Sequence, residues 1–232
     1  RRSALISLSN LSDQRIRTAK TGEWWSTNPE RALANNSVAY TEKPDPGIFM
    51  KEWLSLYESK SGERGIFSRA SAQKKAAENG RRESNWDFGT NPCSEIILRP
   101  NQFCNLTEIV VRAGDTINTL TRKIKVATLL GTIQSTFTNF GYLRKVWQDN
   151  TEEERLLGVS LTGIMDSELL NGRETGLAKT LEKLKKVAVE CNKEYAEKFN
   201  INQSTAITCV KPSGTVSQLV DSASGIHTRH SD

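Results

Sequence analysis

The sequence predicts an α/β fold with a largely parallel sheet. Short apolar segments of strand length alternate with two long stretches of helical periodicity, and turns rich in Gly, Pro and Asn separate them. Strands that alternate with long helices are typical of parallel sheets with crossover helices. A chain of 232 residues can also bury a sizeable core.

In the first part of the chain, we expect strands over residues 4–8 and 38–40 and a helical turn at Trp24 and Trp25. The turn at residues 44–47 precedes an amphipathic helix that ends at the Ser61-Gly62 break. Its apolar face is predicted to contain Phe49, Trp53, Leu54 and Tyr57.

A polar helix over residues 68–79 and a loop over 81–92 follow. Farther along, apolar periodicity predicts two long helices, and short apolar runs predict the strands. The long helices are expected at 115–139 and 175–199, the strands at 95–98, 107–111, 157–164 and 205–210, and a last helix after residue 214.

Composition restricts the class of partner. The net charge is +5 and the pI is about 9.0, but basic and acidic residues are interspersed, which indicates solvated helix faces and not a nucleic-acid surface. No apolar run approaches the ~20 residues that span a bilayer. Four cysteines without CxxC spacing indicate reduced thiols and a cytoplasmic protein.

Metal binding is not predicted. The cysteine spacing does not fit a zinc site, and His227 with His230 supplies only two ligands. Cys191 is on the apolar stripe of its helix and Cys209 is in an apolar segment, so both are expected in the core.

The segment 90–95 carries a thiol, a carboxylate and a carboxamide, on Cys93, Glu95 and Asn91. In an extended segment, residues two apart lie on the same side, so the three groups would face one substrate. The carboxylate could act as a general base. The alternative is an incidental buried cysteine beside a solvated glutamate.

A second motif, residues 212–217, would follow a strand and open a helix. Amides at a helix N-terminus attract anions, and glycine allows close approach of a phosphate. The alternative is an ordinary N-cap, because Ser and Thr are common caps. The candidate phosphate-binding residues are Pro212, Ser213, Gly214, Thr215, Val216 and Ser217.

With both motifs in this order, the chain resembles the large catalytic subunit of ribonucleotide reductases. The matching residues are those of Asn-x-Cys-x-Glu (Asn91, Cys93, Glu95), of Pro-Ser-x-Thr-x-Ser (Pro212, Ser213, Thr215, Ser217), and the opening Arg1-Arg2-Ser3-Ala4. The resemblance implies the central part of a ten-stranded α/β barrel, with the radical cysteine on a finger loop.

The resemblance also implies a role for each site residue. Cys93 would be the thiyl radical that abstracts the 3′ hydrogen, Glu95 the base on the 3′ hydroxyl, and Asn91 a hydrogen-bonding partner of the ribose. Cys104 would be one of two cysteines that reduce the 2′ carbon and form a disulfide. The motif at 212–217 would hold the substrate phosphates.

The Asn-Pro-Cys-Ser-Glu form and the 11-residue gap to Cys104 resemble the adenosylcobalamin-dependent class II enzymes. Residues 34–38 are similar to the branch that reduces triphosphates. Implied partners are a ribonucleotide, a deoxynucleotide effector and a thioredoxin-like reductant. The alternatives are an iron-dependent class I subunit and an inactive nucleotide-binding fragment.

Residues 1–232 are therefore expected to form one partial barrel domain. Its parts would be an effector and substrate-loop region (1–43), a finger-loop region (81–111) and a phosphate-binding strand-turn-helix (205–222). No cysteine precedes Cys93, whereas the family has its other redox cysteine upstream. We expect a fragment that needs the remaining segments of the same enzyme and does not turn over alone.

Overall fold

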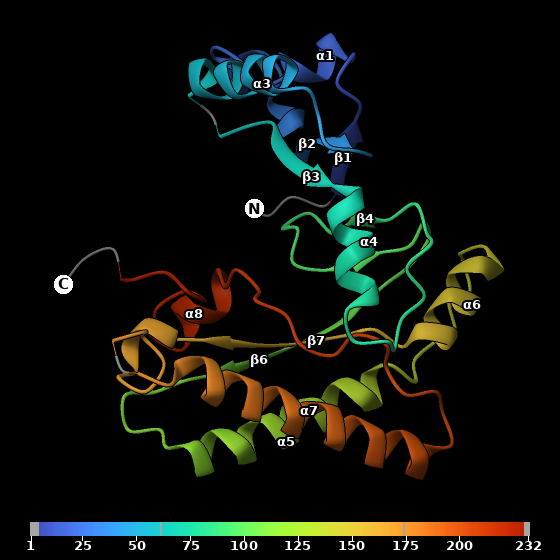
Figure 1. Cartoon of the computed structure of the whole chain (residues 1–232), viewed down its shortest axis with the longest axis vertical. Helices are drawn as coiled ribbons and strands as arrows, with labels where there is room; N and C mark the ends of the chain where they lie inside the picture. Colours follow the sequence, from blue (N-terminus) through green and yellow to red (C-terminus); the bar gives the residue numbers. More distant parts are fainter. Residues whose placement is uncertain (1–4, 61, 174, 230–232) are drawn as a thin grey trace. The chain divides into compact units, whose positions relative to one another are not determined.

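The computed structural model describes residues 5–60, 62–173 and 175–229 (Figure 1). The chain forms two compact units, with the boundary between Pro100 and Asn101. The opening motif at residues 1–4, Ser61 and His230 lie outside the described residues.

The first unit contains a three-stranded parallel sheet. Its order is β1 (Leu5–Ser9), β2 (Ala34–Tyr40) and β3 (Gly65–Ser68). Between β1 and β2 the chain forms α1 (Gln14–Arg17), α2 (Trp24–Thr27) and the 3₁₀ helix η1 (Pro29–Leu33). The predicted strands and helical turn are confirmed, and β2 is longer than expected.

The helix between β2 and β3, α3 (Pro46–Ser59), begins where the sequence predicts. The Asp45 carboxylate caps it by accepting hydrogen bonds from the Gly47 and Ile48 amides. Most of the apolar face predicted for this helix is exposed: Trp53 is 51% and Tyr57 75% exposed.

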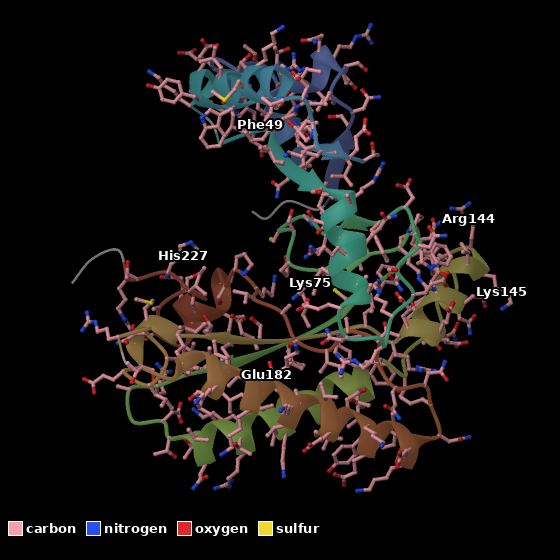
Figure 2. All side chains as sticks on the ribbon, viewed as in Figure 1. Phe49, Lys75, Arg144, Lys145, Glu182 and His227 are labelled. Atoms are coloured by element: carbon pink, nitrogen blue, oxygen red, sulfur yellow. The ribbon has the colours of Figure 1, made fainter. Side chains whose placement is uncertain are left out.

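A buried ion cluster explains this orientation of α3. Glu52 is 1% exposed and receives two hydrogen bonds from Arg64, at 2.5 and 2.9 Å, and one from Arg17 at 3.0 Å. The face of α3 that carries Glu52 is therefore turned inward. Phe49, labelled in Figure 2, packs on Tyr40 with a 6.3 Å centroid distance.

The rest of the first unit consists of α4 (Arg69–Ala77) and a short antiparallel hairpin, β4 (Gly89–Thr90) with β5 (Ile97–Leu98). Ser68 caps α4, as the predicted polar helix requires. The hydrophobic cluster here is small: Ala72, Ala76 and Phe88. The strand predicted over 95–98 is reduced to its last two residues.

The second unit is built on two parallel strands, β6 (Asn105–Val110) and β7 (Leu157–Thr162). The long helices α5 (Ile117–Gln134) and α7 (Leu177–Phe199) pack on each other beside this pair (Figure 1). The core between them contains Ile109, Val111, Leu120, Ile124, Leu157, Val159 and Leu184. Three short elements complete the unit: α6 (Lys145–Glu154), the 3₁₀ helix η2 (Ile164–Asp166) and α8 (Thr215–Leu219).

Three predictions for the second unit need correction. The helix expected to reach residue 139 ends at Gln134, where Arg155 donates to the Ser135 carbonyl. The sequence pattern missed α6, whose residues are mostly polar. The strand expected over 205–210 is only an isolated bridge between Thr208 and Val159.

The α/β class predicted from the sequence is confirmed by these parallel strands and their crossover helices. One partial barrel domain over residues 1–232, with its three regions, stays a prediction. Within the described ranges, we find no helix long and apolar enough to cross a membrane.

Candidate functional site

The turn between β4 and β5 carries Asn91, Cys93 and Glu95. The Ser94 amide donates to the Asn91 carbonyl at 2.9 Å, and Ser94 has a φ of 63°. The segment is therefore a tight turn, and the extended arrangement with two-residue periodicity is wrong. Pro92 favours this turn because its φ is fixed.

Cys93 is a free, exposed thiol in this turn, whereas Asn91 and Glu95 are half-buried. The Asn91 side-chain oxygen accepts a hydrogen bond from the Ile96 amide at 3.0 Å. From β2, the Asn35 side chain donates to the Pro92 carbonyl at 2.5 Å. The first part of the chain therefore fixes the turn that presents the thiol.

Cys104 directly precedes β6 in the second unit, and its thiol is half-buried. Buried Gln102 donates to the Glu154 carboxylate at 2.6 Å, and the Asn105 amide donates to the Leu156 carbonyl at 2.9 Å. Both neighbours of the cysteine segment are thus held by the end of α6 and the start of β7. Sequence reasoning missed Gln102 and Glu154, because no local pattern links residues so far apart.

The candidate residues form two groups. Asn91, Cys93 and Glu95 share one turn of the first unit, whereas Cys104 and residues 212–217 belong to the second. The second group is itself divided: Cys104 is at the N-terminal end of β6, and the 212–217 motif leads into α8.

The 212–217 motif forms a turn and the short helix α8. Ser213 and Ser217 are buried, and the Ser217 amide donates to the Ser213 hydroxyl at 3.2 Å. The Ser217 hydroxyl donates back to the Gly214 carbonyl at 2.8 Å. The N-cap residue of α8 is Gly214, and no side chain caps the helix. Pro212, Gly214, Thr215 and Val216 are exposed, so a ligand would meet mainly these residues.

The remaining cysteines are structural or unassigned. Cys191 is buried, as predicted, and burial raises the pKa of its thiol, so it stays protonated. Cys209 was expected in the core but is half-buried. Across the described residues, no three His, Cys, Asp or Glu side chains are grouped to hold a metal ion.

Comparison with known proteins gives one consistent result. The chain is 29% identical over 98% of its length to the adenosylcobalamin-dependent ribonucleoside-triphosphate reductase of Lacticaseibacillus paracasei. It is 30% identical over 62% of its length to the enzyme of the same name from Lactobacillus gasseri. This chain is similar to the adenosylcobalamin-dependent ribonucleoside-triphosphate reductases. It spans about a third of the L. paracasei reductase.

Solved structures of ribonucleotide reductases have the same fold. A crystal structure of a B12-dependent, class II ribonucleotide reductase matches 97% of the chain with a TM-score of 0.73 and 24% identity, and 34% of that enzyme is covered. The α subunit of the Actinobacillus ureae class Id ribonucleotide reductase matches 95% with a TM-score of 0.62 and 14% identity, and 48% of that subunit is covered. No protein-family model matches the chain.

Proposed function

We propose that this chain is the radical-cysteine and phosphate-binding part of an enzyme that reduces ribonucleoside triphosphates to 2′-deoxyribonucleotides with adenosylcobalamin. One observation carries the proposal. An exposed free thiol, Cys93, stands in a tight turn with Asn91 and Glu95, in a chain similar over 98% of its length to a reductase of that name.

In this proposal, the Cys93 thiyl radical takes the 3′ hydrogen atom of the ribose, while Glu95 accepts the proton of the 3′ hydroxyl. The exposure of Cys93 fits a group that must reach both a radical source and a substrate. Half-buried Glu95 comes two residues after the thiol in the same turn, which suits a general base. Asn91 would donate to the ribose.

Cys104 would supply one of the two thiols that reduce the 2′ carbon. Loss of the 2′ hydroxyl as water requires two electrons, and oxidation of two thiols to one disulfide supplies them. The second thiol would come from an upstream segment of the enzyme, and a thioredoxin-like protein would reduce the disulfide again. The anchoring of Gln102 and Asn105 supports a fixed position for Cys104.

Residues 212–217 would hold the triphosphate through exposed backbone and the Thr215 hydroxyl. Since α8 has only five residues, its dipole adds little, and close approach at Gly214 has to carry the interaction. We infer that buried Ser213 and Ser217 shape this turn from inside.

Adenosylcobalamin would generate the radical when bound. Cys93 could receive this radical, because its thiol is exposed and free. The family's ten-stranded barrel, a cytoplasmic location and deoxynucleotide effectors belong to the same proposal.

The decisive experiment replaces Cys93 in the complete enzyme. Cys93→Ser should abolish deoxynucleotide formation, whereas Cys209→Ser, a control at a half-buried thiol without an assigned role, should retain it. Turnover should require adenosylcobalamin. Activity with iron and a second subunit in its place would favour a class I enzyme, and a biological role that survives Cys93→Ser would favour a binding protein.

A further inference from the structure

The turn that leads into α8 is held by the segment that follows the helix. Residues 221–225, the return segment, pass back against residues 211–214. The Ser224 hydroxyl donates to the Ser213 carbonyl. Gly225 has a φ of +55°, and a Cβ there would lie 3.0 Å from the Lys211 carbonyl oxygen. The return segment therefore sets the position of the turn.

The end of β7 holds the return segment in place. The Gly163 amide donates to the Ala223 carbonyl at 2.8 Å, and the Gly225 amide donates to the Thr162 hydroxyl at 2.8 Å. Thr162 is fully buried and donates to the same Ala223 carbonyl at 3.1 Å. Through these bonds, the return segment links the end of β7 to the turn at residues 211–214.

A carboxylate and a guanidinium fix the return segment from the other side. Asp166 accepts a hydrogen bond from the Ala223 amide at 2.8 Å and pairs with Arg229 through two bonds, at 3.0 and 3.1 Å. Arg229 also donates to the Asp221 carboxylate at 2.5 Å and to its carbonyl at 3.0 Å. His227, labelled in Figure 2, lies between the return segment and Arg229 in the chain.

The electrostatics agree with this geometry. Hydrogen bonds from Arg229 lower the pKa of Asp166 below its usual range. Burial acts to raise this pKa, but the Ala223 amide and nearby positive charges help to outweigh it. The two carboxylates raise the pKa of Arg229 further above its ordinary value. A single surface ion pair contributes little. Here the pair is bidentate, and the same carboxylate also holds a backbone amide, which favours one defined geometry.

We propose that Asp166 and Arg229 are positioning residues for substrate phosphates: they hold the return segment against residues 211–214 and so fix the exposed turn around Gly214. This inference rests on the proposed phosphate role of residues 212–217. Neither residue has to touch the substrate. Their loss should weaken the recognition of the triphosphate and leave the chemistry at Cys93 intact.

The test uses the complete reductase with Asp166→Asn and Arg229→Gln. Arg229 is 46% exposed, so its replacement should not prevent folding. The matched control is the exposed Lys145–Asp149 pair of α6, changed to Lys145→Gln and Asp149→Asn. We expect KM for the ribonucleoside triphosphate to rise by about tenfold with kcat nearly unchanged. The inhibition constant of inorganic tripolyphosphate should rise in parallel, and the control should match wild type.

A third variant, Gly214→Asp, separates this inference from the proposed function, since it adds a negative charge at the turn itself. If Gly214→Asp raises KM but the Asp166 and Arg229 variants do not, the positioning role is wrong and the phosphate site stands. If Gly214→Asp has no effect on KM or tripolyphosphate inhibition, the phosphate site is wrong and the positioning role fails with it. If the Asp166 and Arg229 variants have a lower melting temperature but an unchanged KM, the ion pair only stabilises the fold.

Discussion

Asn91 holds the Cys93 turn through one end of its carboxamide. In the described part of the chain, its side-chain oxygen accepts from the Ile96 amide at 3.0 Å and from the Thr90 hydroxyl at 3.4 Å. Both bonds use the oxygen, so the amide hydrogens are the groups that could meet a ribose hydroxyl. One side chain can therefore shape the turn and bind the substrate.

Asn91→Asp separates these two roles. The aspartate keeps an oxygen for the Ile96 amide, so the turn should persist, but it loses the donor and adds a charge near Glu95. We expect the catalytic efficiency kcat/KM of the complete enzyme to fall by about 100-fold. Exposed Asn85→Asp, in the loop before the hairpin, is the control. Near-normal kcat/KM in Asn91→Asp would show that the amide does not act on the substrate.

At the residue scale, the sequence was sufficient to propose which groups act but not how they are held. The residue types of Asn91, Cys93 and Glu95 were enough to suggest radical and acid–base chemistry. Their predicted alignment was wrong, because Ser94 adopts a positive φ that a period-two argument cannot anticipate. The link between Gln102 and Glu154 spans most of a βαβ crossover, and only the folded chain brings them together.

Among the elements, α3 is held in place by a buried charge, Glu52. Burial acts to raise the pKa of Glu52, but the hydrogen bonds and charges of Arg64 and Arg17 outweigh it, so its pKa lies below the usual range. A carboxyl with a lowered pKa in the folded state stabilises the fold above its unfolded pKa of about 4.3. That stabilisation disappears as the pH falls through the folded-state value.

The stability of the chain should therefore decrease in acid through Glu52. Glu52→Gln should lower the free energy of unfolding at pH 7 by about 3 kcal/mol, because two arginines lose their anionic partner in a buried site. It should also make the free energy of unfolding depend less on pH between about pH 5 and pH 3. Urea unfolding across this range measures both effects, with exposed Glu58→Gln as the control. An unchanged acid slope in Glu52→Gln would assign the slope to other carboxylates.

Element prediction succeeded where apolar periodicity was long and failed where it was short. The pattern identified α5 and α7 because Leu120, Ile124 and Leu184 repeat toward one core. It missed α6, which buries Asn150, Thr151 and Glu154 in place of apolar side chains. It also predicted a strand around Cys209, where residues 206–209 bond to β7 through the backbone but form only an isolated bridge.

At the scale of the whole molecule, the chain exposes apolar side chains, and it is shorter than its relatives. The chain spans about a third of the L. paracasei reductase. On α5, one face packs into the core, while Val126 and Leu130 are 59 and 56% exposed. Val126 and Leu130 also line an open pocket of about 680 Å³ beside β6. Exposed apolar side chains that lie together are typical of contact sites, so we expect another segment of the complete protein to cover this face.

Substitutions on this face should therefore depend on the context of the chain. Val126→Lys with Leu130→Lys should change the free energy of unfolding of the 232-residue chain by less than about 0.5 kcal/mol, since both side chains are already solvated. In the complete reductase the same pair should cost several kcal/mol, because two charges would be buried without partners. Unfolding midpoints in both contexts measure the difference, and exposed Lys125→Gln should be neutral in each. Equal, small effects in both would mean that this face of α5 stays in solvent in the complete protein.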